Sequence, residues 1–211
     1  MNVTIPEGLH ASLSAAKQMP AIALLVRHAD RSAIPSGEHG IDAELLPLGK
    51  ARAAVLRDTL ARQGPRWAMA SPLLRCMETA RCMGLVAEPH HLLGAPGPFV
   101  IDGEAGGRAF LSEGTEAIVR KQLAGHPWPF MRSNEDGAAL VVASIHRALS
   151  ERRGLGICVS HDAIVMPIVA VLTGERFEHR WLSPLDGLVF CLPPGGGLGV
   201  FWEGLYHEVA L

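Results

Sequence analysis

Three short segments place charged or titratable side chains directly after an apolar run. Their members are arginines, histidines and aspartates: Arg27, His28, Asp30, Arg31, Arg75, His161 and Asp162. Charged groups are costly to bury without partners, so such side chains either pair with one another or bind a charged ligand. Guanidinium groups are planar and always charged, and they match the oxygens of a phosphate. If the segments meet in space, their three arginines predict a site for a phosphoryl group.

A histidine beside these arginines adds covalent chemistry to phosphate binding. Neighbouring cations disfavour the protonated imidazole, so His28 is expected to stay neutral at pH 7. A neutral imidazole can attack phosphorus and form a phosphohistidine, which divides one difficult step into two easier ones. A carboxylic acid at the edge of the site can protonate the leaving oxygen. The arginines and His161 would stabilise the charge of the transition state, so no metal or other cofactor is expected.

The elements that position these side chains follow from the apolar pattern. Short, continuous apolar runs typical of buried strands occupy 21–26, 66–70 and 154–160. Helical patterns occupy 48–64, 71–84, 114–124, 136–152 and 161–174. The helix at 71–84 has Ser71 as its expected N-cap and Gly84 as its terminator. Two more strands, at 186–192 and 198–204, flank a Pro- and Gly-rich turn and are expected to pair antiparallel.

Strands that alternate with helices predict an α/β fold. We expect a three-layer α/β/α sandwich whose central sheet is mostly parallel. In such folds the site lies outside the carboxyl ends of the strands. The first three strands each end at one of the charged segments, so residues more than a hundred positions apart are expected to meet on one rim.

Length and composition restrict the classes of protein to which the chain can belong. The chain has 211 residues, of which 48% are hydrophobic and 19% charged, as expected for a single domain over 1–211. Residues 1–20 are expected to form an N-terminal extension and the Gly- and Pro-rich 85–112 a covering loop. A net charge of −2 without a basic stripe argues against nucleic acid as a partner. The N-terminus lacks the pattern of a secretory signal, and no apolar run is long enough for a membrane span, so a cytoplasmic location is expected.

The cysteines and the paired loop histidines do not indicate a metal site. Four cysteines lie in or beside apolar segments without C-x-x-C spacing and are interpreted as buried free thiols: Cys76, Cys82, Cys158 and Cys191. His90 and His91 point apart in an extended segment and have no acidic or cysteine partner at ligand spacing.

The motifs "LLVRHADR", "SPLLRCMETA" and "VSHD" resemble, in order and spacing, the signature segments of the histidine phosphatase superfamily, which has the phosphoglycerate mutase-like fold. The resemblance extends from about residue 21 to residue 192. It implies that His28 is the phosphorylated nucleophile and that no cofactor is needed. It also implies a phosphate clamp made of Arg27, Arg31, Arg75 and His161.

The chain departs from the family pattern at two positions, and the proton donor is the least determined role. Ala29 replaces a common glycine, and Leu46 stands where a capping threonine is common. One branch of the family uses a glutamate after the second motif, and the acid-phosphatase-like branch uses the aspartate of a His-Asp pair. The sequence "SHDA" fits the second pattern, which favours Asp162. The alternatives in or beside the covering loop are Asp102, Glu104 and Glu113.

The sequence therefore predicts a metal-independent phosphatase that hydrolyses a phosphate monoester of a small molecule through a phosphohistidine. Two alternatives are kept. A phosphoglycerate mutase-type phosphotransferase would return the phosphoryl group to substrate and would need a closed site. A non-catalytic phosphate-binding module would keep the arginines without turnover. The oligomeric state is left open.

Overall fold

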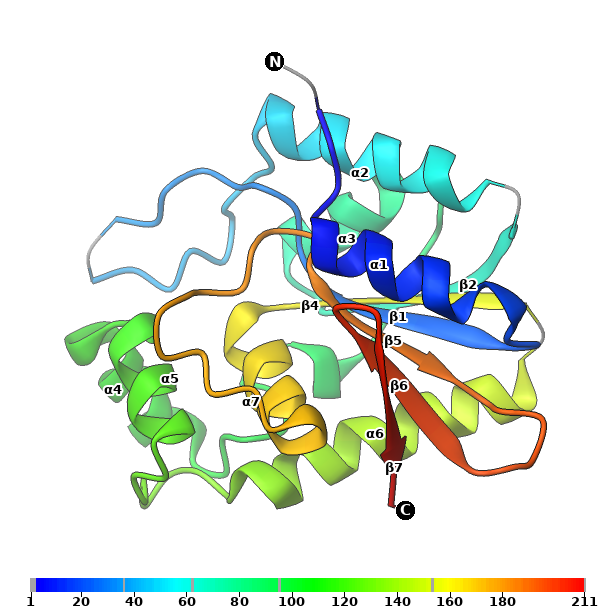
Figure 1. Ribbon diagram of the computed structural model, residues 1–211. Coiled ribbons are helices and arrows are strands. Elements are labelled where there is room, and N and C mark those ends of the chain that lie inside the picture. Colours follow the sequence, from blue (N-terminus) through cyan, green and yellow to red (C-terminus); the bar gives the residue numbers. More distant parts are fainter. Residues whose placement is uncertain (1–2, 36, 62, 95, 153, 211) are drawn as a thin grey trace.

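The computed structural model describes residues 3–35, 37–61, 63–94, 96–152 and 154–210, with the side chains of residues 65 and 66 outside the description. Its centre is a sheet covered by helices (Figure 1). The strands are β1 (Ile22–Arg27), β2 (Pro65–Ala70), β3 (Glu88–Pro89), β4 (Leu155–Ser160), β5 (Gly187–Cys191), β6 (Leu198–Trp202) and β7 (Leu205–Val209). Among the described residues they form one sheet in the order β3-β2-β4-β1-β5-β6-β7.

The sheet is mixed, so the expectation of a mostly parallel sheet is wrong in this respect. β1, β2, β3 and β4 pair parallel with one another, whereas β5 pairs antiparallel with β1, and β6 and β7 continue the sheet antiparallel. The physical reason lies in the connections. Parallel neighbours need a crossover of a dozen or more residues, but the segments that join β5 to β6 and β6 to β7 are only long enough for hairpins.

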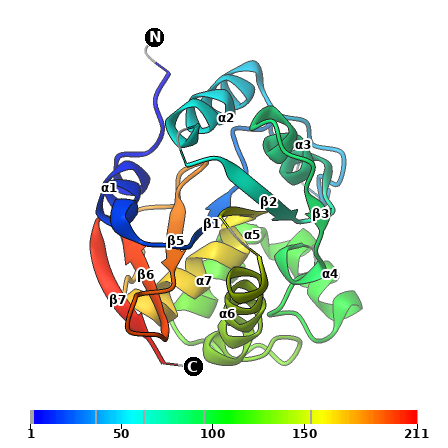
Figure 2. The same ribbon diagram turned by 90° about the vertical axis from the view of Figure 1, so that its right-hand side faces the viewer.

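The helices cover both faces of the sheet, and this confirms the expected three-layer sandwich. The helices are α1 (Glu7–Ala15), α2 (Pro47–Leu60), α3 (Leu74–Cys82), α4 (Gly103–Glu113), α5 (Thr115–Leu123), α6 (Asn134–Glu151) and α7 (Asp162–Thr173), with short 3-10 turns at Ala16–Gln18 and His91–Leu93. Figure 2 shows α2 and α3 on one side of the sheet and α6 and α7 on the other. Among the described residues, no helix is long and apolar enough to cross a membrane. The cytoplasmic location stays a prediction.

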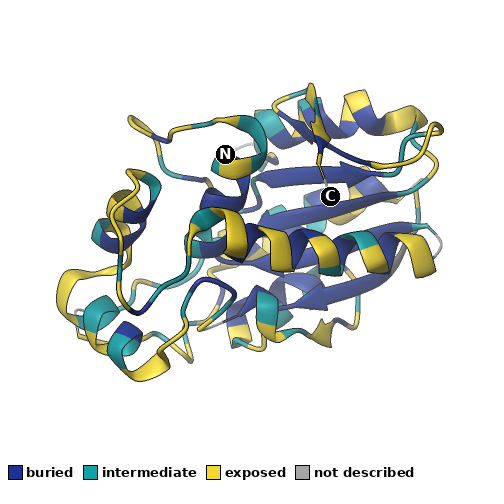
Figure 3. Ribbon diagram, turned by 90° about the horizontal axis from the view of Figure 1, so that it is seen from below, coloured by how far each residue is buried: buried dark blue, intermediate teal, exposed yellow. Residues whose placement is uncertain are grey.

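The molecule has two hydrophobic cores, one on each face of the sheet, and successive side chains of the central strands point alternately into one and the other. Leu24 and Val26 pack in the core beneath α1, α2 and α3, whereas Ala23 and Leu25 pack in the core beneath α6 and α7. β1 and β4 are therefore buried on both faces, and the central strands are among the most buried parts of the molecule (Figure 3). Burial on both faces holds these two strands rigidly, which fixes the positions of the residues that follow them.

Several boundaries differ from the sequence-based expectation. The helix expected at 71–84 begins at Leu74, and its N-cap is Leu73 rather than Ser71. The expected covering loop at 85–112 contains most of α4, because the Asp102 side chain caps that helix by accepting from the backbone N–H groups of Glu104 and Ala105. Residues 1–20 contain α1, which packs on β5 and β6. The final strand β7 has no counterpart in the expectation.

Candidate active site

The carboxyl ends of β1, β2 and β4 bring the three charged segments to one edge of the sheet. Arg27 at the end of β1 lies opposite Ser160 at the end of β4. The backbone N–H of His28 donates to the Ser160 carbonyl at 2.8 Å, and that of Ser71 donates to the Val159 carbonyl at 2.9 Å. The backbone of the sheet therefore positions the side chains that begin each following segment.

A cavity of about 820 Å³ opens at this edge, and its lining contains all six residues predicted for the site: Arg27, His28, Arg31, Arg75, His161 and Asp162. Helices α4 and α5 and the loop at 32–43 complete its walls. Two of the alternative proton donors do not line it: Asp102 is occupied as a helix cap, and exposed Glu104 pairs with Arg108. Glu113, the third alternative, does line it.

His28 lies at the base of the cavity and is 2% exposed. Its Nδ1 lies 2.8 Å from the Ala29 carbonyl oxygen, which can only accept, so Nδ1 carries the proton and Nε2 keeps a lone pair. Burial, with the charges of Arg27 and Arg75, lowers the pKa of His28 to about 3, against the opposing effect of the Ala29 hydrogen bond. The imidazole is therefore neutral and has a free nucleophilic nitrogen at pH 7.

His161 faces His28 across the base of the cavity, with ring centroids 5.5 Å apart and the ring planes at 67°. Its Nε2 forms a 2.8 Å hydrogen bond with the Ser71 hydroxyl, and the Cys76 thiol lies 3.6 Å from the same nitrogen. Burial lowers the pKa of His161 well below its usual value, and the charge of Arg75 adds to the effect. His161 is therefore also neutral, and its orientation is fixed by Ser71.

The three arginines are held by backbone carbonyls. Arg31 donates from Nη1 to the Ser32 carbonyl and Arg75 donates to the Gly40 carbonyl, each at 2.7 Å, and Arg27 donates to the Leu182 carbonyl. The Nε atom of each arginine is buried and has no hydrogen-bond partner among the described residues. Burial and repulsion between the guanidinium groups lower the pKa values of Arg31 and Arg75. Buried donors without partners, beside like charges, fit an anion with several oxygens.

Both carboxylate oxygens of Asp162 already accept hydrogen bonds. Its Oδ2 accepts from Arg27 Nη2 at 2.8 Å and from Trp181 Nε1 at 2.9 Å, and its Oδ1 accepts from the Ala163 backbone N–H at 2.9 Å. Burial by itself raises the pKa of Asp162, but Arg27 and these hydrogen bonds hold the pKa below its usual value. Asp162 is therefore ionised when the site holds no anion.

The structure shows the roles of two residues in the site that the sequence did not indicate. Trp181 reaches Asp162 from an irregular segment, and a lone tryptophan there gives no signal in the sequence. Ser71 stood out as a helix cap, yet it orients His161. Asp30, by contrast, forms an ion pair with Arg52 at 2.9 Å and so has a structural partner outside the site.

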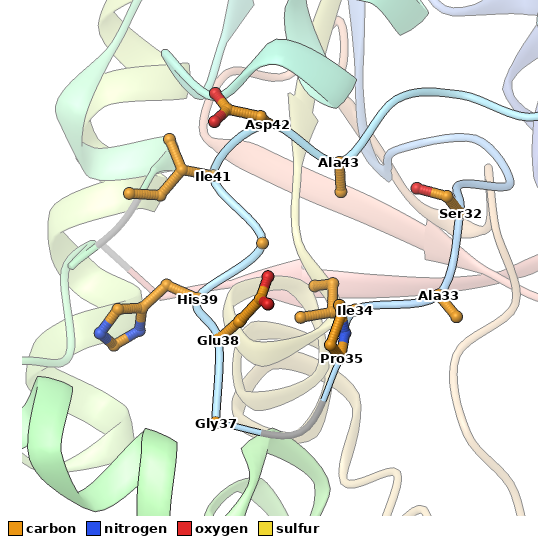
Figure 4. A pocket seen from close by; sticks show the side chains of 11 residues that line it. Ser32, Ala33, Ile34, Pro35, Gly37, Glu38, His39, Ile41, Asp42 and Ala43 are labelled. Carbon is orange, nitrogen blue, oxygen red and sulfur yellow. The ribbon is translucent and has the colours of Figure 1, made fainter.

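The loop at 32–43 encloses a second hollow of about 490 Å³. Figure 4 shows its side chains, with Ile34 and Glu38 near the middle and the ring of His39 pointing away from them. Several loop residues line both hollows, Glu38 and His39 among them, so the second hollow adjoins the mouth of the main cavity. Among the described residues, no group of three or more histidine, cysteine, aspartate or glutamate side chains could hold a metal ion.

Comparison with known proteins gives one family match. Residues 23–92 match the model of the histidine phosphatase superfamily (branch 1), and this stretch contains the first two motifs. No curated protein matches the chain.

Several solved structures share the fold. Mycobacterial glucosyl-3-phosphoglycerate phosphatase is 16% identical, with 81% of this chain and 89% of that chain covered and a TM-score of 0.53. Mycobacterial hydrolase 2 is 17% identical, with 90% and 93% covered and a TM-score of 0.57. Phosphoserine phosphatase from Entamoeba histolytica, in complex with 3-phosphoglyceric acid, is 18% identical, with 89% and 97% covered and a TM-score of 0.58. These likenesses confirm the expected phosphoglycerate mutase-like fold.

Proposed function

We propose that this chain is a member of the histidine phosphatase superfamily and hydrolyses the phosphate monoester of a small molecule through a covalent phosphohistidine at His28. One observation carries the proposal: a buried, neutral imidazole with a free Nε2 lines the same cavity as three guanidinium groups. Two of the structurally similar proteins are phosphatases by name, which supports the same class of reaction.

In the first step, the lone pair on His28 Nε2 attacks phosphorus. An N–P bond forms while the ester P–O bond breaks, and the leaving oxygen takes a proton. The three arginines stabilise the charge on the non-bridging oxygens, and His161 adds a neutral polar group held by Ser71. These groups are positioned before substrate binds, so little reorganisation is needed during the reaction.

Asp162 is the proposed proton donor, and the arriving phosphate prepares it for this role. The free carboxylate is held ionised by Arg27. A bound dianion competes for the guanidinium group of Arg27, weakens the ion pair and so raises the pKa of Asp162. Asp162 can then take up a proton and deliver it to the leaving oxygen. In the second step water attacks phosphorus, the N–P bond breaks, and Asp162 accepts a proton from the water.

The mouth of the cavity favours hydrolysis over phosphoryl return. Glu38 and His39 are exposed, and Ile41 is 59% exposed, so water can reach the cavity past these side chains. A phosphotransferase of the mutase type would have to exclude that water.

The direct test is turnover of 4-nitrophenyl phosphate by the wild type, His28→Ala and the exposed control His91→Ala. We expect His28→Ala to lose activity by at least about a thousandfold, because the nucleophile is gone, and His91→Ala to match the wild type. Equal rates in wild type and His28→Ala would overturn the enzyme proposal. Phosphate binding without turnover in the wild type would identify a phosphate-binding module instead.

A second pair of variants tests the proton donor. Asp162→Asn should lose far more activity toward an alkyl phosphate than toward 4-nitrophenyl phosphate, because only the poor leaving group needs a proton. Glu113→Gln, which changes the other predicted acid in the lining, should not show this difference. If only Glu113→Gln shows it, the donor role moves to Glu113.

A further inference from the structure

We propose that the alcohol released from the substrate is uncharged and largely apolar, without a carboxylate or a second phosphate. This inference rests on the proposed function, because it takes the arginine end of the cavity as the place of the transferred phosphoryl group. It deepens that function by naming the substrate class.

Much of the wall beyond the arginines is apolar. Six side chains show this: Phe99, Val100, Phe110, Leu111, Met131 and Ile164. They come from separate parts of the chain that meet around the cavity, including α4 and α7. An organic group that leaves the phosphate in this direction is therefore bounded by hydrocarbon, which favours burial of apolar surface.

One of these walls is held firmly by the backbone. Val100 and Met131 form an isolated antiparallel bridge. The Phe99 carbonyl accepts from the Arg132 backbone N–H at 2.9 Å, and the Phe99 ring packs so closely on Gly137 that a Cβ there would lie 2.1 Å from it. The apolar wall is thus preformed and does not depend on substrate to order it.

Positive charge in the cavity is confined to one end. Among the described residues, the only lysine or arginine side chains in the lining are Arg27, Arg31 and Arg75, which the proposed function assigns to the phosphoryl group. Glu113 and Glu116 line the cavity, but the cations that pair with them lie outside its lining.

At the mouth the lining adds a carboxylate and, among the described residues, no lysine or arginine. Glu38 lines the cavity and has no ion-pair partner among the described residues. Glu38 and His39 are both exposed on this loop, so water weakens the electrostatic effect of either side chain on a bound anion. A carboxylate on the leaving group would lose its hydration against the apolar wall and meet no paired cation in return. This distribution of charge disfavours acids such as 3-phosphoglycerate and favours phenols and apolar alcohols.

The test measures binding and turnover separately. Binding uses two phosphonates that cannot be hydrolysed, benzylphosphonate and 4-carboxybenzylphosphonate, with dissociation constants from isothermal titration calorimetry. We expect benzylphosphonate to bind at least about tenfold more tightly. Equal or tighter binding of the carboxylate would overturn the inference, whether or not the protein turns over any ester.

Turnover uses 4-methylphenyl phosphate, 4-(carboxymethyl)phenyl phosphate and 3-phosphoglycerate. We expect kcat/KM to be highest for the methyl compound and lower by about tenfold or more for both acids. If the binding preference holds but no ester is hydrolysed faster than by His28→Ala, the proposed function fails while the character of the cavity stands.

A charge-reversal variant tests the effect of the charge at the mouth. Glu38→Lys places a cation at the mouth without touching the arginines or histidines. We expect it to raise the ratio of kcat/KM for the carboxymethyl compound to kcat/KM for the methyl compound several-fold. An equal change for both compounds would contradict the proposed role of charge at the mouth.

Discussion

Loss of stability in acid should follow from the burial of neutral imidazoles at the base of the cavity. His28 is 2% exposed, and burial with the nearby arginine charges lowers its pKa to about 3. In the unfolded chain the same group has its ordinary pKa of 6.5, so below that pH the unfolded state binds a proton that the native state does not bind. The free energy of unfolding is therefore unaffected by His28 above pH 6.5 and falls as the pH drops from 6.5 toward 3.

The size of this effect follows from the two pKa values. At pH 5 the native His28 is still neutral, and the linkage relation gives a loss of about 2 kcal/mol compared with pH 7.5. His161 contributes with the same sign, because burial also lowers its pKa. Replacement of His28 by asparagine removes one of the two contributions. The drop in unfolding free energy between pH 7.5 and pH 5 should thus be about 2 kcal/mol smaller in His28→Asn than in the wild type.

Urea denaturation at both pH values measures this difference directly. Phosphate must be absent from the buffer, because an anion that binds the native site would stabilise it. His10→Asn, at an exposed position on α1, is the matched control and should reproduce the wild-type drop. If His28→Asn loses as much stability as the wild type between the two pH values, His28 is not a buried neutral imidazole and the reasoning is refuted.

Two further substitutions test the site and the packing of the fold separately. Ser71→Ala removes the 2.8 Å hydrogen bond to His161 and should lower kcat/KM by roughly 5- to 30-fold, equivalent to about 1–2 kcal/mol; an unchanged value in steady-state assays would show that Ser71 does not position the ring. Gly49→Ala places a methyl group 2.2 Å from the Asp30 carbonyl oxygen, a backbone atom, and should destabilise the fold by about 1–3 kcal/mol in urea denaturation. Gly195→Ala, whose Cβ would meet nothing within 4 Å, is its control and should denature like the wild type.

The sequence predicted the buried strands and the meeting of their ends because both follow from local pattern. The run that ends at Val26 is apolar throughout, and a strand buried on both faces needs such a run. Once β1, β2 and β4 are parallel, Arg27 and His161 must share an edge of the sheet. The direction of β5 could not be read in the same way, because it depends on how the chain returns to the sheet.

The sequence did not predict α4 or β7, because tertiary contacts stabilise these elements against their local preference. α4 contains three glycines, which weaken a helix, yet Asp102 caps it and Gly106 packs where a Cβ would lie 2.8 Å from the Val100 side chain. β7 exposes most of its residues, so it lacks the alternation that marks a strand, and Val209 is its buried member. The contact of Trp181 with Asp162 spans an irregular segment that carries no periodic signal.

Trapping of the covalent intermediate tests the account most directly. The protein is mixed with a phosphomonoester, quenched in alkali within milliseconds, and analysed by mass spectrometry and phosphorus NMR. Because Nδ1 of His28 donates to the Ala29 carbonyl, we expect phosphate on His28 at Nε2 and none in His28→Ala. Phosphate on a different residue, phosphate on Nδ1 of His28, or a burst of product with no phosphorylated protein would contradict the mechanism.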